Sequence, residues 1–557
     1  MTDFDVVVVG QGPVGATAAC LLADEGLTVL ALERDLTAHP LPRAARFDGE
    51  TMRTFQRIGV ADEIERKTYV GGGGQFLSAD GDYLGGWRYR PPSNGWENSY
   101  YFFQPELEEI LNRRAEAQLG VEVRRGAALL DYEDRDDGIR VRARLADGSA
   151  ATYTARYLLG CDGARSTVRS IMAAAIDDVG YEERWVVVDV NLLEPVELPP
   201  IITQYCVPDR PATFVPGRGV HRRWEFMLAD HEDAHSFDPP DAIHAMLHRY
   251  VDPAQVEIIR STLYTFHSLV CRDWRKGRVL LAGDAAHQTP PFLGQGMCGG
   301  IRDAQNLAWK LAAVANGWAP DALLDTYQAE REPHFRRIME RAIECGRIVG
   351  VFDRDVASRR DQDFLRRLAE GDVPFSSYQV PHLTGGLLAE DAEPPAGSLA
   401  RQGQVEDMRG YRQLLDEVVG GGAVLLVAAD AWSGSADDTA LLREAAERAG
   451  TTVCAIRSEA SRHTDLSSFP GDAVMSLDPG LSKWMSDHRF VLVRPDRYVQ
   501  GVADSTLAAV ALLHQWLRSV RPSRQIDDHR SAVAEIQANA TGHHRGLLES
   551  LHGTEGG

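Results

Sequence analysis

The first 35 residues hold the pattern that most constrains the fold. Phe4 to Val9 is a Val-rich run, typical of a strand buried on both faces, and it leads into Gly10-Gln11-Gly12-Pro13-Val14-Gly15. A helical stretch, Ala16 to Glu25, follows, and Leu27 to Leu32 is a second apolar strand that ends in Glu33. A glycine turn between strand and helix, with an acid after the second strand, indicates a βαβ unit that binds a dinucleotide.

Each glycine of this turn has its own physical role. Gly10 lets the chain turn sharply, Gly12 lets the backbone approach a pyrophosphate, and Gly15 lets the helix pack close to the sheet. The helix N-terminus then presents unpaired N–H groups and a positive dipole end to the phosphates. Glu33 follows where a carboxylate would bind ribose hydroxyls. The alternative is a tight βα turn without a ligand.

Further strands indicate a second sheet. Ala155 to Gly160 and Arg278 to Ala282 are apolar and break at glycine-containing loops, around Asp162 and Asp284. These loops favour FAD over NAD as the dinucleotide. Between them, Trp185 to Leu192 is β-branched and Arg222 to Leu228 alternates, so we expect a separate sheet that covers the nucleotide domain.

The C-terminal third has the pattern of another α/β unit. Residues 355–395 are rich in Arg, Asp, Pro and Gly, which suggests a linker. Beyond them, Ala423 to Ala428 and Phe490 to Val493 are predicted strands, and Asp438 to Ala449 is a predicted amphipathic helix. The end of the chain is polar and His-rich.

Composition limits the partners. The formal net charge of −22 argues against nucleic acid as a main partner. Seven scattered Cys, never spaced as C-x-x-C, indicate reduced thiols, no metal site and a cytoplasmic location. No apolar run reaches the roughly 18 residues of a membrane span, and the acidic N-terminus is unlike a signal peptide. We therefore expect no membrane partner; a homo-oligomer stays open.

Three motifs in this order resemble the flavin-dependent aromatic-ring monooxygenases, the group of para-hydroxybenzoate hydroxylase. They are Gly10-Gln11-Gly12-Pro13-Val14-Gly15, Gly160-Cys161-Asp162-Gly163-Ala164-Arg165-Ser166 and Gly283-Asp284-Ala285-Ala286-His287. Four further segments are similar to 3-(3-hydroxyphenyl)propionate hydroxylases: Trp185 to Val190, Arg210-Pro211 through Met227, Arg302-Asp303 with Asn306 to Lys310, and Val493 to Val499.

The resemblance implies an α/β fold with three parts. A Rossmann-like FAD-binding domain would carry an interposed mixed-sheet substrate domain, and a thioredoxin-like domain would follow at the C-terminus. The expected boundaries are 1–180 and 271–355 for the FAD-binding domain, 181–270 with a contribution from 70–103 for the substrate domain, 356–395 for the linker, 396–520 for the thioredoxin-like domain and 521–557 for a polar tail.

The resemblance also implies which residues bind the cofactor. The glycine turn and Glu33 would bind the ADP half, Asp284 the ribityl chain, and Gly294 to Met297 would lie beside the isoalloxazine ring. Family members often have Asn and then Ser or Thr where Cys298 and Gly299 stand here, so we read Cys298 as a packed small residue. The full set is Gly10, Gly12, Pro13, Gly15, Glu33, Arg34, Arg43, Gln104, Asp162, Asp284, Pro291, Gly294, Gln295, Gly296 and Met297.

The implied activity is hydroxylation of a phenolic ring with NADH or NADPH and O₂, through a flavin C4a-hydroperoxide. No side-chain nucleophile is needed, so no catalytic residue is assigned. The expected reaction is ortho-hydroxylation of 3-(3-hydroxyphenyl)propionate, or of a similar phenolic acid, in aromatic catabolism. The alternatives are a resorcinol-like or polyketide phenol, and a non-catalytic flavin-binding redox sensor. A flavin-dependent halogenase is disfavoured because the Trp-x-Trp-x-Ile-Pro segment of those enzymes is missing from the sequence.

The substrate-contacting residues are expected on the interposed sheet. Tyr205, Phe214 and Trp224 could line an aromatic pocket or form ordinary sheet core. Arg222, with its neighbours Arg210 and Arg223, could pair with a substrate carboxylate, or could face solvent or pair with Glu225. Two histidines complete the set: His267 could polarise the phenol or be a satisfied core residue, and His287 is expected to fix its own loop.

Overall fold

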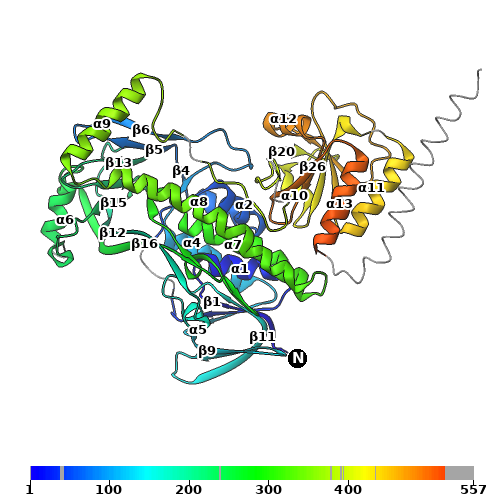
Figure 1. Ribbon diagram of the computed structural model, residues 1–557, viewed down its shortest axis with the longest axis horizontal. Coiled ribbons are helices and arrows are strands. Elements are labelled where there is room, and N and C mark those ends of the chain that lie inside the picture. Colours follow the sequence, from blue (N-terminus) through cyan, green and yellow to red (C-terminus); the bar gives the residue numbers. More distant parts are fainter. Residues whose placement is uncertain are drawn as a thin grey trace, which may run out of the picture.

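The computed structural model describes residues 2–520, with the exception of 38–42, 238–239, 377–378, 389–391, 393 and 433. The polar tail expected at 521–557 lies outside the described residues. Figure 1 shows three sheet-based parts, with the long helix α8 (Asp325–Val349) crossing the middle of the molecule. Within the described ranges, no helix is both long and apolar enough to cross a membrane, and no three His, Cys, Asp or Glu side chains cluster as a metal ion would require.

The nucleotide-binding sheet forms as the first residues predict. The buried strand β1 (Phe4–Val9) pairs in parallel with β2 (Val29–Glu33) on one side and with β11 (Ala150–Gly160) on the other. Helix α1 (Pro13–Asp24) begins within the glycine turn, directly after Gly12. The other strands of this sheet are β8 (Val121–Arg125), β9 (Ala128–Arg135), β10 (Gly138–Arg144), β17 (Arg275–Lys276) and β18 (Val279–Leu281).

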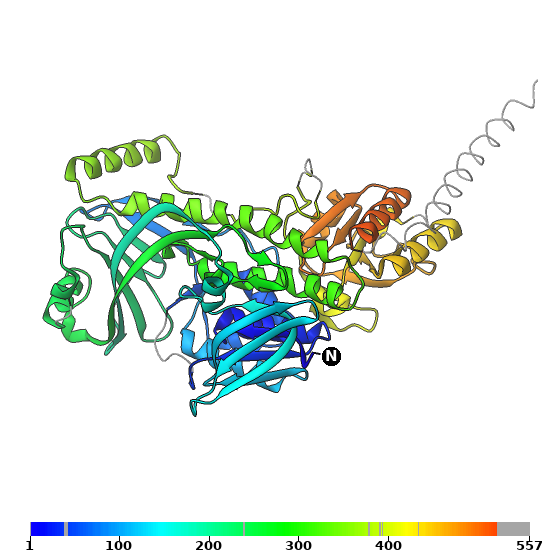
Figure 2. The same cartoon turned by 60° about the horizontal axis from the view of Figure 1, so that its bottom comes forward.

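The interposed sheet is confirmed and has eight strands in the order β19-β16-β12-β15-β14-β13-β5-β6. Its long strands β12 and β16 run antiparallel and rise from the nucleotide-binding part, as Figure 2 shows. Strands from the region 70–103 form one edge of it. The bounds are β5 (Gly73–Leu77), β6 (Tyr83–Arg88), β12 (Ile176–Leu192), β13 (Ile202–Tyr205), β14 (Ala212–Val215), β15 (His221–Met227), β16 (Val256–Cys271) and β19 (His287–Gln288).

Helices and a small sheet join the first two parts. The helix α7 (Gly296–Ala315) is almost wholly buried and packs against α1. The remaining elements here are the three-stranded sheet β3 (Arg46–Phe47), β7 (Tyr100–Tyr101) and β4 (Tyr69–Val70), and the helices α2 (Gly49–Arg57), α3 (Ala61–Arg66), α4 (Gln104–Ala117) and α5 (Thr167–Met172). The helix α6 (Pro240–Leu247) instead packs on the interposed sheet.

The linker expected at 356–395 is wrong for its first part, because a helix, α9 (Arg354–Ala369), lies there. Asp353 caps this helix by accepting hydrogen bonds from the N–H groups of Asp355 and Val356. Ala357 is its one fully buried residue within the described part, so it shows no apolar stripe from which a helix could be read.

The C-terminal part is a seven-stranded sheet whose core is compatible with the expected thioredoxin-like unit. The parallel pair β22 (Val424–Ala428) and β23 (Thr452–Arg457) is followed by the antiparallel hairpin β25 (Phe490–Val493) and β26 (Val499–Ala503). The other elements are β20 (Gln404–Glu406), β21 (Arg412–Leu414), β24 (Asp472–Ser476), α10 (Leu415–Val419), α11 (Ala436–Ala449), α12 (Pro479–Asp487) and α13 (Thr506–Val520).

The C-terminal part docks on the rest through buried side chains. Trp309 of α7 and Trp516 of α13 belong to one hydrophobic cluster, with ring centroids 5.6 Å apart. Beside them, Arg494 donates to both carboxylate oxygens of Glu330 on α8, at 2.9 and 2.7 Å. Lys310 donates to the same carboxylate at 2.8 Å, and all three side chains are fully buried. The C-terminal domain is therefore fixed to α7 and α8 by charge as well as by apolar contact.

Candidate active site

A cavity of about 550 Å³ lies between the glycine turn and the second sheet. Because β1 and β2 end at this point, it occupies the carboxyl edge of the nucleotide-binding sheet, where open α/β sheets bind ligands. Most of the residues that the sequence assigns to the cofactor line it. They are Gly10, Gly12, Pro13, Glu33, Arg34, Arg43, Gln104, Asp162, Asp284, Pro291, Gly294, Gly296 and Met297.

The glycine turn has the shape of a phosphate cradle. Gly10 has φ +96°, and a Cβ there would lie 2.5 Å from the Cys161 carbonyl oxygen. A Cβ on Gly15 would lie 1.9 Å from the Gly10 oxygen, so Gly15 supports the turn from behind rather than lining the cavity. At Gly12 a Cβ would meet nothing within 4 Å. The space beside Gly12 and the α1 N-terminus is therefore open to an anionic ligand.

Two side chains next to the turn fit a polar ligand. The Glu33 carboxylate accepts hydrogen bonds from the N–H of Gln11 at 2.8 Å and of Asp35 at 2.9 Å, which fixes it at the cavity wall. Gln11 is 3% exposed, and its side-chain amide makes no hydrogen bond within the described part of the chain. A buried amide left unpaired is costly, so a bound group with hydrogen-bonding atoms would stabilise this wall.

Gln104 acts on the cavity through the loop before β3. Its Oε1 accepts hydrogen bonds from the backbone N–H of Arg43 at 2.7 Å and of Ala44 at 2.6 Å. Its Nε2 donates to Glu108 at 2.5 Å, and the Arg43 guanidinium pairs with the same carboxylate at 3.2 Å. The Gln104 amide therefore positions Arg43 at the cavity.

The two aspartates expected near the flavin have different surroundings. The Asp162 carboxylate accepts from the Ser166 hydroxyl at 2.5 Å and from the N–H of Thr167 at 2.6 Å, so it shapes its own loop. Asp284 is exposed to the cavity, and no hydrogen bond to its carboxylate is found among the described residues. Desolvation by the surrounding protein raises the pKa of Asp284, and interactions with His287 and Arg43 oppose the rise. Its unused acceptor oxygens suit the hydroxyls of a ribityl chain.

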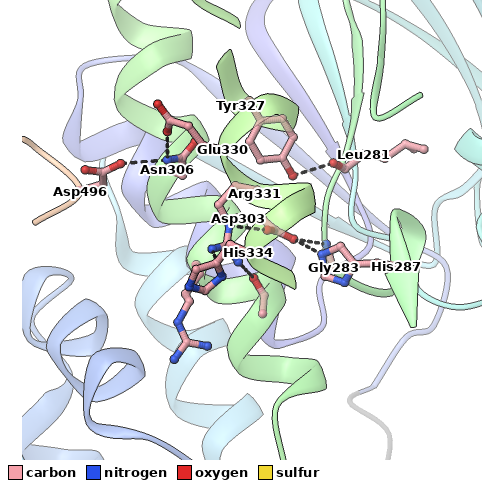
Figure 3. A network of polar contacts seen from close by, with 12 residues as sticks. Leu281, Gly283, His287, Asp303, Asn306, Tyr327, Glu330, Arg331, His334 and Asp496 are labelled. Atoms are coloured by element: carbon pink, nitrogen blue, oxygen red, sulfur yellow. Dashed lines mark hydrogen bonds and ion pairs between the residues drawn. The ribbon is translucent and has the colours of Figure 1, made fainter. Parts of the chain in front are cut away.

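His287 fixes the Gly283 loop, as expected. Its Nε2 is 2.6 Å from Asp303 Oδ2, which also accepts from the Gly283 N–H at 3.0 Å. Arg331 of α8 donates to the other oxygen of Asp303 at 2.9 Å. Figure 3 shows these groups converging between α7 and α8, with Tyr327 donating to the Leu281 carbonyl beside them. This buried network holds the loop that carries Asp284.

The loop expected beside the isoalloxazine ring is fixed by side-chain hydrogen bonds on the side away from the cavity. Gly294 has φ +60°, and α7 begins two residues later. The Gln295 side chain is buried and lies outside the cavity lining: its Nε2 donates to Asp48 at 3.0 Å and its Oε1 accepts from Arg302 at 2.9 Å, so a contact of this residue with the cofactor would have to come from its backbone. Arg302 also donates to Glu50 at 2.6 Å.

This buried chain of contacts continues into the C-terminal domain. The Tyr498 hydroxyl donates to the second oxygen of Glu50 at 2.6 Å, so Glu50 joins Tyr498 to Arg302 and, through it, to Gln295. The sequence offers no signal for this link, because its members are far apart along the chain.

Cys298 is packed within α7, as expected. It is fully buried, and burial raises the pKa of its thiol to about 11. The other six Cys are buried as well, and burial raises the pKa of each. None of the seven is in a disulfide.

We expect these thiols to be inert in the native protein, because the thiolate is the reactive form. A chromogenic disulfide reagent at pH 8 should titrate fewer than one thiol per native chain over minutes and all seven after denaturation in guanidinium. Rapid reaction of a native thiol would contradict the burial described above.

The substrate candidates on the interposed sheet lie on the wrong face. Phe214 and Trp224 are a cross-strand pair in a hydrophobic cluster with ring centroids 4.8 Å apart, and Tyr205 packs against the same cluster. Arg222 is half-buried and donates to two backbone carbonyls of its own turn. The expectation that these four contact substrate is therefore wrong, and the alternative of ordinary sheet core is right for the three aromatics.

The sequence neighbours of two of these aromatic residues lie on the cavity face of the same strands. Thr213 and Val215 of β14, and Arg223 and Glu225 of β15, line the cavity. Thr213 is paired directly with Glu225 across the two strands. Side chains alternate along a strand, so the aromatic residues and the cavity-lining residues point to opposite faces of the sheet.

The arginines on this sheet are already paired. Arg223 and Arg260 both donate to the buried Asp189, at 2.9 and 2.7 Å. Burial alone would raise the pKa of Asp189, but hydrogen bonding to His221 and these cations lower it. Arg210 pairs with Glu232 at 2.5 Å. His267 lines the cavity while pairing with the exposed Glu182 at 3.1 Å, so it is not a core residue.

Comparison with known proteins identifies the scaffold. A family model described as an FAD binding domain matches residues 3–342, and one described as an HcaD C-terminal domain matches residues 397–518. The chain belongs to the FAD-binding aromatic hydroxylase family. FAD is therefore its cofactor, and the open cradle at Gly12, the unpaired Gln11 amide and the Asp284 carboxylate fit that group.

Relatives of this FAD-dependent hydroxylase carry two kinds of name. A protein of Rhodococcus jostii (strain RHA1) named as a probable NADH-specific resorcinol 4-hydroxylase is 38% identical over 93% of this chain and 95% of its own length. A 3-(3-hydroxy-phenyl)propionate/3-hydroxycinnamic acid hydroxylase of Mycobacterium sp. (strain JLS) is 37% identical over 76% of each chain. The crystal structure of aklavinone-11 hydroxylase with FAD and aklavinone matches with a TM-score of 0.73 at 26% identity, covering 94% of this chain and 99% of that one.

Proposed function

We propose that this FAD-dependent hydroxylase uses NADH and O₂ to hydroxylate a neutral phenol of the resorcinol class. The observation that carries the proposal is the single cavity that runs from the glycine turn to the sheet face at Thr213 and Glu225. One continuous space lined by both sets of residues can hold a dinucleotide together with a small aromatic ring. When bound, FAD supplies electron transfer from the nicotinamide and the activation of O₂.

The chain's own residues bind, orient and exclude water. The glycine turn and the α1 N-terminus would hold the pyrophosphate, and Asp284 would accept hydrogen bonds from the ribityl hydroxyls. The N-terminus of α7, at Gly296 and Met297, lines the cavity, and its N–H groups and positive dipole end would stabilise negative charge on the ring. The sheet face holds the phenol and keeps water from the reacting atoms.

The charges of the cavity wall favour a neutral phenol. Arg223 and Arg260 are paired with Asp189, and the Glu225 carboxyl lies on the same face. A substrate carboxylate there would approach Glu225, and like charges at close range disfavour each other. Phenolic hydroxyls instead find an acceptor. The name of the Rhodococcus relative supports the same substrate class.

A phenolic acid is the second candidate. Several relatives, including the Mycobacterium protein, are named as hydroxylases of 3-(3-hydroxyphenyl)propionate, and ortho-hydroxylation of that compound by this chain is the corresponding proposal. Its carboxylate would need Arg223 to exchange part of its contact with Asp189 for the ligand.

The test is a phenol panel with the FAD-loaded enzyme. We expect resorcinol to accelerate NADH oxidation and to yield a product one oxygen atom heavier by mass spectrometry. Faster flavin reduction with 3-(3-hydroxyphenyl)propionate than with resorcinol would instead support the second candidate. If no phenol accelerates flavin reduction or is hydroxylated, both candidates fail and a non-catalytic flavoprotein remains.

A further inference from the structure

Glu225 has the placement of a residue that receives a proton from the substrate. Its side chain lies on the cavity face of β15, is 6% exposed, and accepts no hydrogen bond in the described part of the chain. The nearest cation is the Arg223 guanidinium, whose Nη1 is 3.9 Å from Glu225 Oε1, beyond hydrogen-bonding distance. A buried carboxylate needs hydrogen bonds, and the side of Glu225 that faces the cavity is where a ligand can provide one.

The charged groups around Glu225 set its proton affinity. Arg223 lies on the same strand, Asp189 comes from β12, and Arg260 comes from β16. Burial raises the pKa of Glu225 to about 7; Asp189 adds to the rise, and Arg223 and Arg260 oppose it. Near neutral pH the group therefore passes between carboxylic acid and carboxylate, which is the property that a general base requires.

The cluster formed by Glu225, Arg223, Arg260 and Asp189 has a net charge that suits the transfer of one proton. With Glu225 ionised, the two guanidinium groups are balanced by Asp189 and Glu225. Once Glu225 is protonated, the cluster holds one net positive charge, which balances a phenolate beside it. The total charge of cluster and substrate is the same before and after the transfer, so no isolated charge is created in the cavity.

Building on the proposed function, we propose that Glu225 accepts the proton of the substrate's phenolic hydroxyl. The phenol O–H bond breaks, an O–H bond forms on the Glu225 carboxyl, and the electron pair stays on the phenol oxygen. The resulting phenolate pushes electron density to its ortho and para carbons, where the ring is hydroxylated. Glu225 releases its proton when the product leaves, so the residue is regenerated in each cycle.

The test compares Glu225→Gln with wild type, both loaded with FAD, using resorcinol as the probe. In wild type, kcat/KM for resorcinol should rise with pH through about 7, as Glu225 becomes the carboxylate. In Glu225→Gln this rise should be shifted toward the pKa of a free phenol, about 10. Its kcat/KM at pH 8 should fall by about 100-fold, the lower end for loss of a general base.

Glu183→Gln is the matched control. Burial also raises the pKa of Glu183 to about 7, but this carboxyl is not among the residues that line the cavity. We expect it to keep the wild-type pH profile of kcat/KM, and both variants to keep the wild-type Kd for FAD. A Glu225→Gln enzyme with the wild-type pH profile and kcat/KM overturns the proposal while leaving the proposed function intact. A wild type that binds no phenol overturns both.

Discussion

The Glu330→Ala variant should lose about 3–5 kcal/mol of stability, the cost of leaving buried charges without their partner. Glu330 accepts hydrogen bonds from Arg494 and Lys310, which are fully buried with it. Burial alone would raise the pKa of Glu330, but the two cations outweigh it and lower that pKa. Removing the carboxylate leaves two buried positive charges between α7, α8 and the C-terminal domain without their shared partner. Asp496 compensates only Arg494 directly.

The measurement is urea unfolding of the FAD-loaded protein, followed by fluorescence. Glu340→Ala on the same helix is the control: its side chain is exposed, and surface substitutions usually change stability by about 0.5 kcal/mol or less. We expect a much lower urea midpoint for Glu330→Ala than for Glu340→Ala. Equal midpoints would show that the buried ion network does not stabilise the domain interface.

The Gly15→Ala variant should lose both stability and FAD. Its Cβ would lie 1.9 Å from the Gly10 carbonyl oxygen, and the obstacle is backbone that shapes the cradle itself. Strain of this kind costs about 1–3 kcal/mol. If the strain is released by moving the cradle, the Kd for FAD should rise by roughly 10- to 100-fold, since about 1.4 kcal/mol is a factor of ten.

Variants at two other glycines separate the effect on stability from the effect on FAD binding. At Gly12 a new Cβ meets no protein atom within 4 Å, so Gly12→Ala should keep the stability of the FAD-free protein and still weaken FAD binding by occupying ligand space. At Gly422, in the C-terminal domain, a Cβ also meets nothing, and Gly422→Ala should change neither property. Flavin fluorescence titration and thermal unfolding of the FAD-free proteins measure the two effects. Normal FAD affinity in Gly15→Ala would contradict the role assigned to the close approach at Gly10.

The nucleotide-binding half could be predicted from sequence because its signals are local. The glycine turn, the strands around it and Glu33 lie within 35 residues, and each follows from backbone sterics or from a strand buried on both faces. The helix over 354–369 could not be predicted in the same way, because it buries so little apolar surface that its composition resembles a loop.

The substrate face could not be assigned because both faces of the interposed sheet are buried. Along β15, six of seven residues are buried, so alternation of apolar and polar residues does not mark the core. Trp224 looks like a pocket residue and is core, whereas Glu225 looks like a surface residue and lines the cavity. Only the tertiary packing of a cluster on one face and a cavity on the other distinguishes them.

The contact between Tyr498 and Glu50 bears on how the enzyme is made. Glu50 steadies Arg302 and, through it, the bend that carries Gln295, so this bend reaches its final arrangement only with Tyr498 in place. Tyr498 is translated nearly 500 residues after the phosphate cradle. A nascent chain still on the ribosome can therefore form its first βαβ unit long before the bend at Gln295, which depends on Tyr498, reaches its final arrangement.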